Sequence, residues 1–248
     1  MPENKIIKMT GSLNFRDLGG IQLSNGLQVR ERMLFRSDGL SRLTEKDQQL
    51  FAKLNINTII DLRHTEEIAK APDKLPLYIS ITSHACGFYA KGTKELFQAV
   101  NSGQIDSLTS KKMMRNIYAK MPIKHTKEIQ HIIRLLIDRN STPCLIHCMS
   151  GKDRTGLVIA IILKAVGAPL SVIMHDYKMS NGEYQKVDVF GSKALPECVA
   201  AVMAAEESYL QASFDSIHEA YGTFENYLAD GLMLNQKEID KLTQILTQ

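Results

Sequence analysis

The segment that decides the fold of this chain reads Ile146-His147-Cys148-Met149-Ser150-Gly151-Lys152-Asp153-Arg154-Thr155-Gly156. The apolar run Pro143 to Ile146 predicts a short buried strand, and Leu157 to Val166 predicts a helix. A turn between a strand and a helix aims backbone N–H groups and a helix N-terminus at one point, which makes an anion site. The segment therefore predicts an α/β fold with an anion-binding loop after a strand.

Three side chains of this loop suggest its chemistry. Dipoles that bind an anion also favour a thiolate at Cys148. Arg154 has a planar fork that can grip two phosphate oxygens, and Thr155 could donate to the sulfur and improve it as a leaving group. A nucleophile beside a phosphate clamp predicts phosphoryl transfer through a phosphocysteine, with no metal and no cofactor. The alternative is that Cys148 is a small buried hydrophobe beside a helix cap.

In this mechanism Cys148 attacks phosphorus in line while the loop amides bind three phosphate oxygens. Arg154 tightens its grip as charge spreads over those oxygens in the transition state. The predicted phosphate-binding residues are Met149, Ser150, Gly151, Lys152, Asp153 and Arg154.

The loop resembles the phosphate-binding loop of the cysteine-dependent protein tyrosine phosphatases, and more narrowly that of a bacterial branch with mycobacterial and listerial members. The resemblance implies a tyrosine-phosphatase-like fold and a phosphatase. It implies as substrates phosphotyrosine proteins, with phosphoserine, phosphothreonine or phosphoinositides as further options. The other segments that resemble this branch are Asn14 to Gly20, Phe35 to Asp38, Thr58 to Arg63, Asp176 to Asn181 and Tyr221 to Leu228.

A general acid must protonate the leaving oxygen, and the sequence leaves its identity open. Larger tyrosine phosphatases use the aspartate of a Trp-Pro-Asp loop, but this chain has no tryptophan. Asp153 is the first candidate, with a structural carboxylate bonded to loop amides or to Arg63 as the alternative. Asp61, at the end of a predicted strand, is the second, although a structural role is favoured for it. Asp73 is interpreted as part of a solvated turn.

Lys152 bears on the choice of substrate. A cation two residues before Arg154 adds positive charge at the rim of the pocket, where a second phosphate could bind. Lipid-directed members of the superfamily also have lysine here, so the resemblance implies phosphoinositides as well as phosphotyrosine. The alternative is a lysine that pairs with Asp153 or nearby carboxylates. His147 is expected to point away from the phosphate and to bond loop backbone.

Alternation of predicted strands and helices indicates a central, largely parallel sheet flanked by helices. We expect a single domain over residues 1–248, with a sheet core at 1–168, the loop at 147–156 and a helical region at 169–248. The predicted elements are a hairpin over Gln22 to Arg36, helices at 44–54, 65–69 and 123–139, strands at 56–62 and 77–81, and helical patches at 94–100 and 108–120.

Two amphipathic segments of the helical region, Val199 to Tyr209 and Phe214 to Tyr221, raise a further possibility. They could fold over the site as a lid, as the resemblance implies, and shield Cys148 from oxidant and water. The alternative is ordinary packing on the sheet.

Composition limits the partners and the location. A net charge of +3 over 248 residues gives no argument for nucleic acid or a membrane surface. Met1 to Thr10 has no apolar run of signal-peptide length, and no segment is long enough to cross a membrane. We expect a phosphoprotein or phosphoinositide substrate, no nucleic acid, no stable membrane insertion, and a cytoplasmic protein or one exported by another signal.

The four cysteines form no CxxC pair and have no zinc-like spacing with histidine, which indicates a reducing compartment. Cys86 or Cys144 could protect Cys148 through a reversible disulfide, but inert buried thiols are favoured. Two other functions stay open. One is a phosphate-binding or phosphoprotein-trapping module without turnover, and the other is a rhodanese-type sulfur transferase.

Overall fold

The chain folds around a six-stranded sheet in the computed structural model, which describes residues 5–138, 141–182 and 190–248. Its strands lie in the order β1-β2-β3-β6-β4-β5. Strands β3, β6, β4 and β5 run parallel, whereas β1 and β2 pair antiparallel at one edge. The α/β fold with a largely parallel sheet is therefore confirmed. The strands are β1 (Lys5–Ile6), β2 (Arg16–Asp17), β3 (Leu34–Ser37), β4 (Thr58–Asp61), β5 (Thr82–Ala85) and β6 (Cys144–His147).

The helices follow the strands in the order typical of an α/β protein. They are α1 (Glu45–Lys53), α2 (Thr65–Lys70), α3 (Thr93–Ser102), α4 (Ser107–Lys124), α5 (Thr126–Ile137), α6 (Asp153–Ala165), α7 (Leu170–Lys178), α8 (Pro196–Met203), α9 (Glu207–Tyr221), α10 (Phe224–Asn226) and α11 (Gln236–Leu246), with a 3-10 turn η1 (Met179–Asn181) and a π-helical turn η2 (Tyr227–Gly231).

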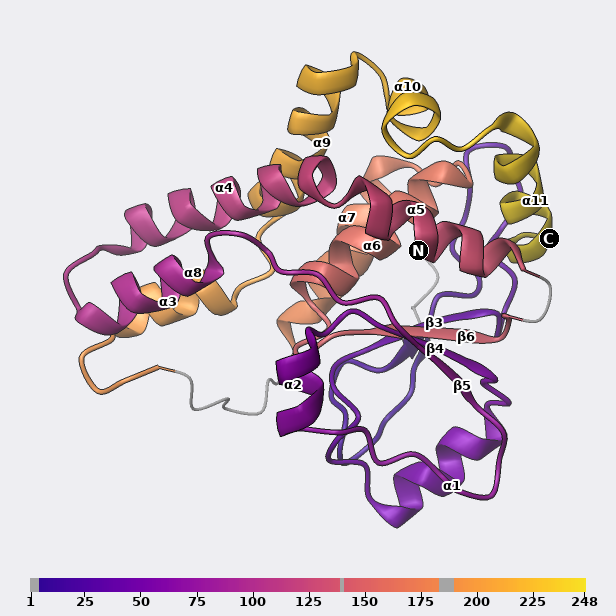
Figure 1. Cartoon of the computed structure of the whole chain (residues 1–248), viewed down its shortest axis with the longest axis horizontal. Coiled ribbons are helices and arrows are strands. Elements are labelled where there is room, and N and C mark those ends of the chain that lie inside the picture. Colours follow the sequence, from indigo (N-terminus) through magenta and orange to yellow (C-terminus); the bar gives the residue numbers. More distant parts are fainter. Residues whose placement is uncertain (1–4, 139–140, 183–189) are drawn as a thin grey trace.

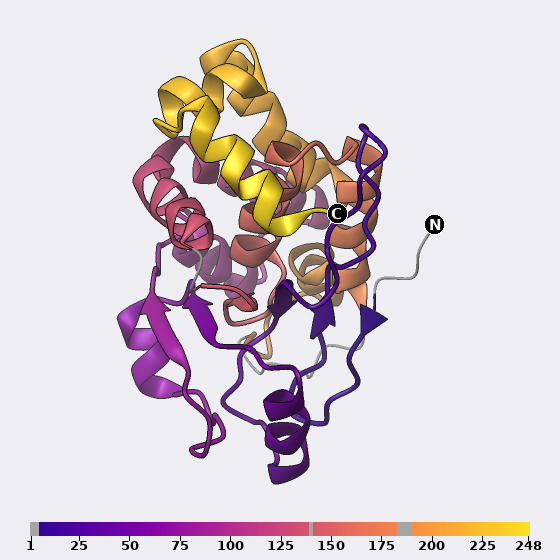
Figure 2. The ribbon, with the colours of Figure 1, turned by 90° about the vertical axis from the view of Figure 1, so that its right-hand side faces the viewer.

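Side chains alternate between the two faces of the sheet along each strand, and an apolar core covers each face. Ile59 and Leu145 point to one face and pack with Phe51 of α1. Ile60 and Ile146 point to the other face and join the core formed with α5, α6 and α7. Figure 1 and Figure 2 show α1 on one side of the sheet and the long helices on the other. In Figure 1, α3, α8 and the start of α4 extend beyond the sheet.

The register places three strand ends at one edge. Ser37 of β3 and Asp61 of β4 are both paired with His147 of β6, so these parallel strands end together. Cys148 follows directly, at the carboxyl edge where open α/β sheets bind ligands.

Two sequence-based boundaries were wrong. The strand predicted over residues 77–81 lies instead at Thr82–Ala85, and Leu77 is almost fully exposed. This strand pairs with β4 alone, at the sheet edge, and most of its side chains are exposed, so no apolar pattern marks it. The helix predicted from residue 123 begins at Thr126, because α4 continues through Pro122 to Lys124. The predicted end of that helix, Arg139, lies outside the described residues.

The hairpin predicted around Asn25-Gly26 is present, and its pairing reaches back beyond Gln22 to β2. The turn at Asn25-Gly26 forms, with Gly26 at a φ of 85° and Gln22 bridged to Gln28. The second arm returns along the first, since Val29 N–H donates to Ile21 O at 2.8 Å and β3 pairs antiparallel with β2. The other side of Leu34–Ser37 pairs with β6 in the central sheet. Among the described residues, no helix combines the length and apolar character that a membrane crossing requires.

Candidate active site

Cys148 lies at the centre of the carboxyl edge, between the ends of β3 and β4. Its side chain is 2% exposed, at the bottom of a loop that runs into α6 at Asp153. The strand, loop and helix predicted from the sequence are therefore present in that order, and they bring Cys148 and Arg154 to the two ends of one turn.

Three backbone carbonyls of this loop accept hydrogen bonds from groups outside the loop. Asn14 Nδ2 donates to Ser150 O at 3.1 Å, and the Gly39 amide donates to Met149 O at 2.9 Å. Gly151 O accepts from Arg36 Nη2 at 2.6 Å. Among the described residues, the amides at positions 149, 150, 151, 153 and 154 have no acceptor. These unpaired N–H groups make the loop a ready anion cup.

Gly151 is required by this geometry. Its φ of 66° lies in the left-handed region, and a Cβ there would meet Ser37 O at 2.4 Å. Any side chain would push the loop off the end of β3. The glycine thus lets the loop pack directly against the neighbouring strand.

A buried ionic network holds the outer side of the loop. Asp176 of α7 accepts a hydrogen bond from Arg16 Nε on Oδ1, at 2.9 Å, and one from Arg36 Nη1 on Oδ2. Arg36 also donates to Gly151 O, so a charge from β3 links α7 to the loop. Burial alone would raise the pKa of Asp176, but the two guanidinium groups lower it below its usual value. Arg16, Arg36 and Asp176 lie in segments that resemble the bacterial branch, but no role was predicted for them; the signal available was charge inside otherwise buried segments.

Arg154 is held from behind by Glu67 of α2. Its Nη1 donates to Glu67 Oε2 at 2.6 Å and its Nη2 to Oε1 at 2.7 Å. Nη1 also donates to Leu62 O at 2.9 Å. A guanidinium has five N–H donors, so two are left without an acceptor among the described residues, on Nε and Nη2. These two lie on one edge and form a fork suited to two oxygens of a tetrahedral anion.

Arg154 and Glu67 each stabilise the charged form of the other. Burial would lower the pKa of Arg154, but the hydrogen bonds to Glu67 and the negative groups around it raise that pKa. The pKa of Glu67 is lowered below its usual value, because Arg154 outweighs the opposing effect of burial. The guanidinium is therefore charged and fixed before any ligand arrives. The sequence alone did not predict this role of Glu67.

Asp153 lies at the start of α6 with its side chain 32% exposed. Its Oδ1 accepts from Tyr118 Oη of α4 at 2.7 Å, and Tyr118 Oη is 2.7 Å from Tyr177 Oη of α7. Neither Arg63 nor a loop amide bonds Asp153 among the described residues, so the partners named by the structural alternative are not its partners. Tyr118 was missed, because nothing in the sequence links α4 to the loop.

The position of Lys152 corrects the expectation that its charge lies at the pocket rim. The side chain is buried, and Nζ donates to Val202 O at 2.6 Å and to Ala204 O at 3.1 Å. Nζ also lies 3.3 Å from Asp153 Oδ1. The ammonium thus ties the loop to the end of α8, as the alternative pairing partly predicted.

Asp61 belongs to a separate ionic cluster behind the loop. Its carboxylate accepts side-chain hydrogen bonds from Arg63, whose Nε lies 2.9 Å from Oδ1 and 3.1 Å from Oδ2 and whose Nη2 lies 2.7 Å from Oδ2. Arg63 Nη2 also reaches Asp73 Oδ1 at 2.8 Å, and His147 Nε2 lies 3.2 Å from Asp73 Oδ2. Asp73 is therefore not in a solvated turn, since the charge of Arg63 draws it inward. His147 Nδ1 lies 3.3 Å from Cys148 O, which agrees with its expected contact to loop backbone.

The remaining candidate residues are Thr155, Cys86 and Cys144. Thr155 Oγ1 is buried and has no hydrogen-bond partner among the described residues, so the expected bond to the Cys148 sulfur is not formed. Cys86 and Cys144 are free and buried, and burial raises the pKa of Cys86 to about 11. Cys144 begins the strand that ends before Cys148, about 13 Å away at the usual rise per strand residue. That separation is beyond disulfide reach.

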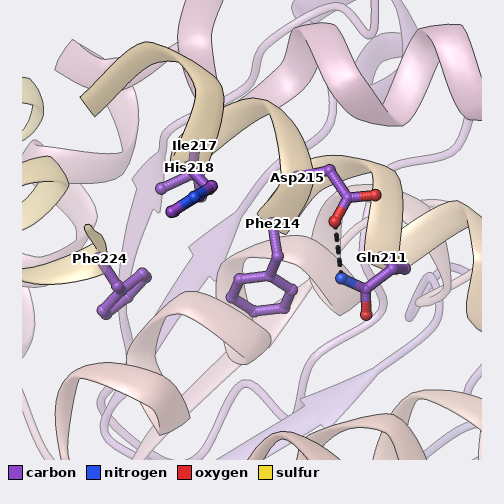
Figure 3. Close-up of a pocket in the computed structure, with 6 residues that line it drawn as sticks. All are labelled: Gln211, Phe214, Asp215, Ile217, His218 and Phe224. Atoms are coloured by element: carbon purple, nitrogen blue, oxygen red, sulfur yellow. Dashed lines mark hydrogen bonds between the residues drawn. The ribbon is translucent and has the colours of Figure 1, made fainter. Parts of the chain in front are cut away.

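A surface hollow elsewhere is not part of this site. Figure 3 shows a pocket on α9 and α10, where Phe214 and Phe224 face one another beside the Gln211–Asp215 hydrogen bond. No residue of the loop lines it.

Comparisons with known proteins cover most of the chain. A family model described as the tyrosine phosphatase family matches residues 7–248. The triple specificity protein phosphatase PtpB of Mycobacterium tuberculosis is 26% identical over 277 residues, which cover 96% of this chain and 98% of that protein. A Cupriavidus necator protein predicted to be a tyrosine-protein phosphatase is 25% identical over 91% of this chain and 84% of its own. The catalytic core of the PP-IP phosphatase SIW14 from S. cerevisiae superposes with a TM-score of 0.40, at 16% identity, over 73% of this chain and 85% of that one.

Proposed function

Because the chain belongs to the tyrosine phosphatase family and is a phosphatase, we propose that Cys148 is its nucleophile and phosphotyrosine proteins are its main substrates. The observation that carries this proposal is the loop after Cys148. The carbonyls of Met149, Ser150 and Gly151 are bonded by groups outside it, while its amides at positions 149, 150, 151, 153 and 154 and the Nε–Nη2 edge of Arg154 have no acceptor among the described residues. Such a cup matches the oxygens of a phosphate monoester in number and charge.

The first chemical step transfers the phosphoryl group to sulfur. The Cys148 thiolate attacks phosphorus in line, and an S–P bond forms as the P–O bond to the leaving group breaks. The electron pair of that bond goes to the leaving oxygen, which takes a proton from Asp153. The loop amides and the Nε–Nη2 edge of Arg154 hold the three equatorial oxygens.

The second step restores the enzyme. Water attacks phosphorus and gives its proton to the Asp153 carboxylate, while the S–P electron pair returns to Cys148. Phosphate leaves, and Asp153 is again protonated. The Thr155 hydroxyl, which is buried without a partner among the described residues, would donate to the sulfur as its charge returns. Asp61 has no part in the reaction, since Arg63 occupies its carboxylate.

The rim supports an aryl phosphate. Tyr89 is 53% exposed, and its ring lies 4.2 Å from that of His64 at the start of α2. Tyr89 Oη is 3.5 Å from Glu66, the neighbour of the residue that holds Arg154. An exposed aromatic surface beside the cup can stack on a substrate ring. The depth of Cys148 also favours the long side chain of phosphotyrosine.

The burial of Lys152 disfavours phosphoinositides as the main substrates, because its ammonium is bonded to two backbone carbonyls at the end of α8.

Phosphate release from a phosphotyrosine peptide, a phosphoserine peptide and short-chain phosphoinositides tests the proposal. We expect turnover to be fastest with phosphotyrosine and to vanish in Cys148→Ser. Persistent release by folded Cys148→Ser would refute the nucleophile, and faster release from phosphoinositides would refute the substrate preference.

A further inference from the structure

The carboxylate of Asp153 has two unequal oxygens. Tyr118 Oη donates to Oδ1 at 2.7 Å, and the ammonium of Lys152 lies 3.3 Å from the same oxygen. Among the described residues Oδ2 has no partner. Lys152 can only donate, so Oδ1 is held as an acceptor. A proton on this carboxyl group therefore belongs on Oδ2.

The proton of Tyr118 is also directed. Its single hydroxyl hydrogen goes to Asp153, so the 2.7 Å contact with Tyr177 Oη is a bond in which Tyr177 donates. Tyr118 is fully buried, and the pKa of its hydroxyl is raised well above the usual value by burial and by the nearby Asp153. The hydroxyl is therefore protonated, and able to donate, around neutral pH.

The tyrosine is fixed by the helical part of the chain. Its ring lies 6.0 Å from that of Tyr177 and 5.8 Å from that of Tyr209, and Ser213 of α9 donates to its backbone oxygen at 2.8 Å. Lys152 is likewise fixed by the end of α8. Both contacts to Asp153 Oδ1 therefore come from groups that α4, α7, α8 and α9 hold in place.

We propose that Tyr118 is the positioning residue of the general acid: it binds Asp153 Oδ1 and so presents the protonated Oδ2 to the leaving oxygen. This inference rests on the proposed role of Asp153. During the first step the proton on Oδ2 passes to the leaving oxygen, and the carboxylate keeps the Tyr118 bond. During the second step the same oxygen takes the proton of the attacking water. Tyr118 neither gives nor takes a proton.

The experiment measures kcat/KM for two phosphate esters with different leaving groups on the same preparation of each variant. An alkyl or phenyl phosphate needs protonation of its leaving oxygen, whereas 4-nitrophenyl phosphate has a leaving group that departs readily without it. We expect Tyr118→Phe to lower kcat/KM for phenyl phosphate about tenfold more than for 4-nitrophenyl phosphate, the size expected for a hydrogen bond to a carboxylate. Retained turnover of 4-nitrophenyl phosphate shows that the variant is folded.

Two comparisons decide the result. Tyr209→Phe removes a buried hydroxyl from the same cluster, but this hydroxyl donates to Ala201 O. We expect the variant to change kcat/KM for both substrates by the same factor. Asp153→Asn should show the same leaving-group dependence as Tyr118→Phe in stronger form, and Tyr118→Phe should add nothing to it.

The possible failures are distinct. An equal loss with both substrates in Tyr118→Phe, beside a selective loss in Asp153→Asn, would overturn the positioning role alone. An equal loss in both variants would overturn the assignment of Asp153 as well. Turnover by Cys148→Ser would overturn the proposed mechanism itself.

Discussion

Glu67 and Arg154 face one another with two parallel hydrogen bonds of 2.6 and 2.7 Å, although they lie on α2 and α6. The carboxylate occupies one edge of the guanidinium and leaves the Nε–Nη2 edge without an acceptor among the described residues. A carboxylate that holds an arginine this way fixes its orientation before substrate binds, which lowers the entropy lost in binding.

Replacing Glu67 with glutamine should therefore misalign Arg154. One of its two acceptors becomes an NH2 group that faces a guanidinium N–H, so the parallel pair cannot form. We expect kcat/KM for a phosphotyrosine peptide to fall about 10- to 100-fold, since a charge-assisted bond contributes about 1.5–3 kcal/mol. Steady-state kinetics of Glu67→Gln beside Glu66→Gln, an exposed neighbour, measure this effect. Equal activity of the two variants would contradict it.

Gly151 offers a test of the loop itself. Alanine there meets Ser37 O at 2.4 Å and must adopt a positive φ, so Gly151→Ala should displace the loop and abolish most phosphate release. Gly167→Ala is the matched control, because Gly167 also has a positive φ but nothing lies within 4 Å of its added carbon. That variant should lose only about 1 kcal/mol of stability from backbone strain. Comparable activity losses in both would show that strain, and not the steric contact, governs the loop.

The sequence predicted the parallel sheet and the loop because both depend on local patterns. The buried runs at Thr58–Asp61 and Cys144–His147 and the helix after the loop are apolar enough to be recognised one at a time. The edge strand Thr82–Ala85 was missed for the converse reason, since three of its four side chains are exposed.

The site was predicted less completely, because its supports come from distant parts of the chain. Asp153 and Lys152 could be named from the loop, but Tyr118 and the carbonyl of Val202 reach them from 35 and 50 residues away. A buried lysine that ends on backbone carbonyls looks in sequence like one at a pocket rim. Burial and pairing, which decide between the two, appear only when the helices pack.

Asp73 predicts how stability depends on pH. Burial would raise its pKa, but His147 and Arg63 lower it below the ordinary 3.8. A carboxyl group with a lowered folded pKa stabilises the fold above its unfolded pKa, and this contribution is lost as the pH falls through the folded pKa. Asp73→Asn should thus cost about 1 kcal/mol near neutral pH, and the difference from wild type should shrink below about pH 4. Urea unfolding from neutral to acid pH measures it, and a difference that grows on acidification would contradict it.

Lys152 gives a prediction that separates a structural role from a substrate role. Lys152→Met keeps most of the buried volume but removes the donors to Val202 O and Ala204 O, and it leaves Asp153 without its cation. Two carbonyls without these donors should lower the free energy of unfolding by about 2–3 kcal/mol. The ratio of phosphotyrosine to phosphoinositide turnover should stay constant, because the ammonium does not reach the rim. Urea unfolding and the two activities measured on one preparation decide the matter. A selective loss of phosphoinositide turnover at unchanged stability would mean that Lys152 leaves α8 and binds substrate.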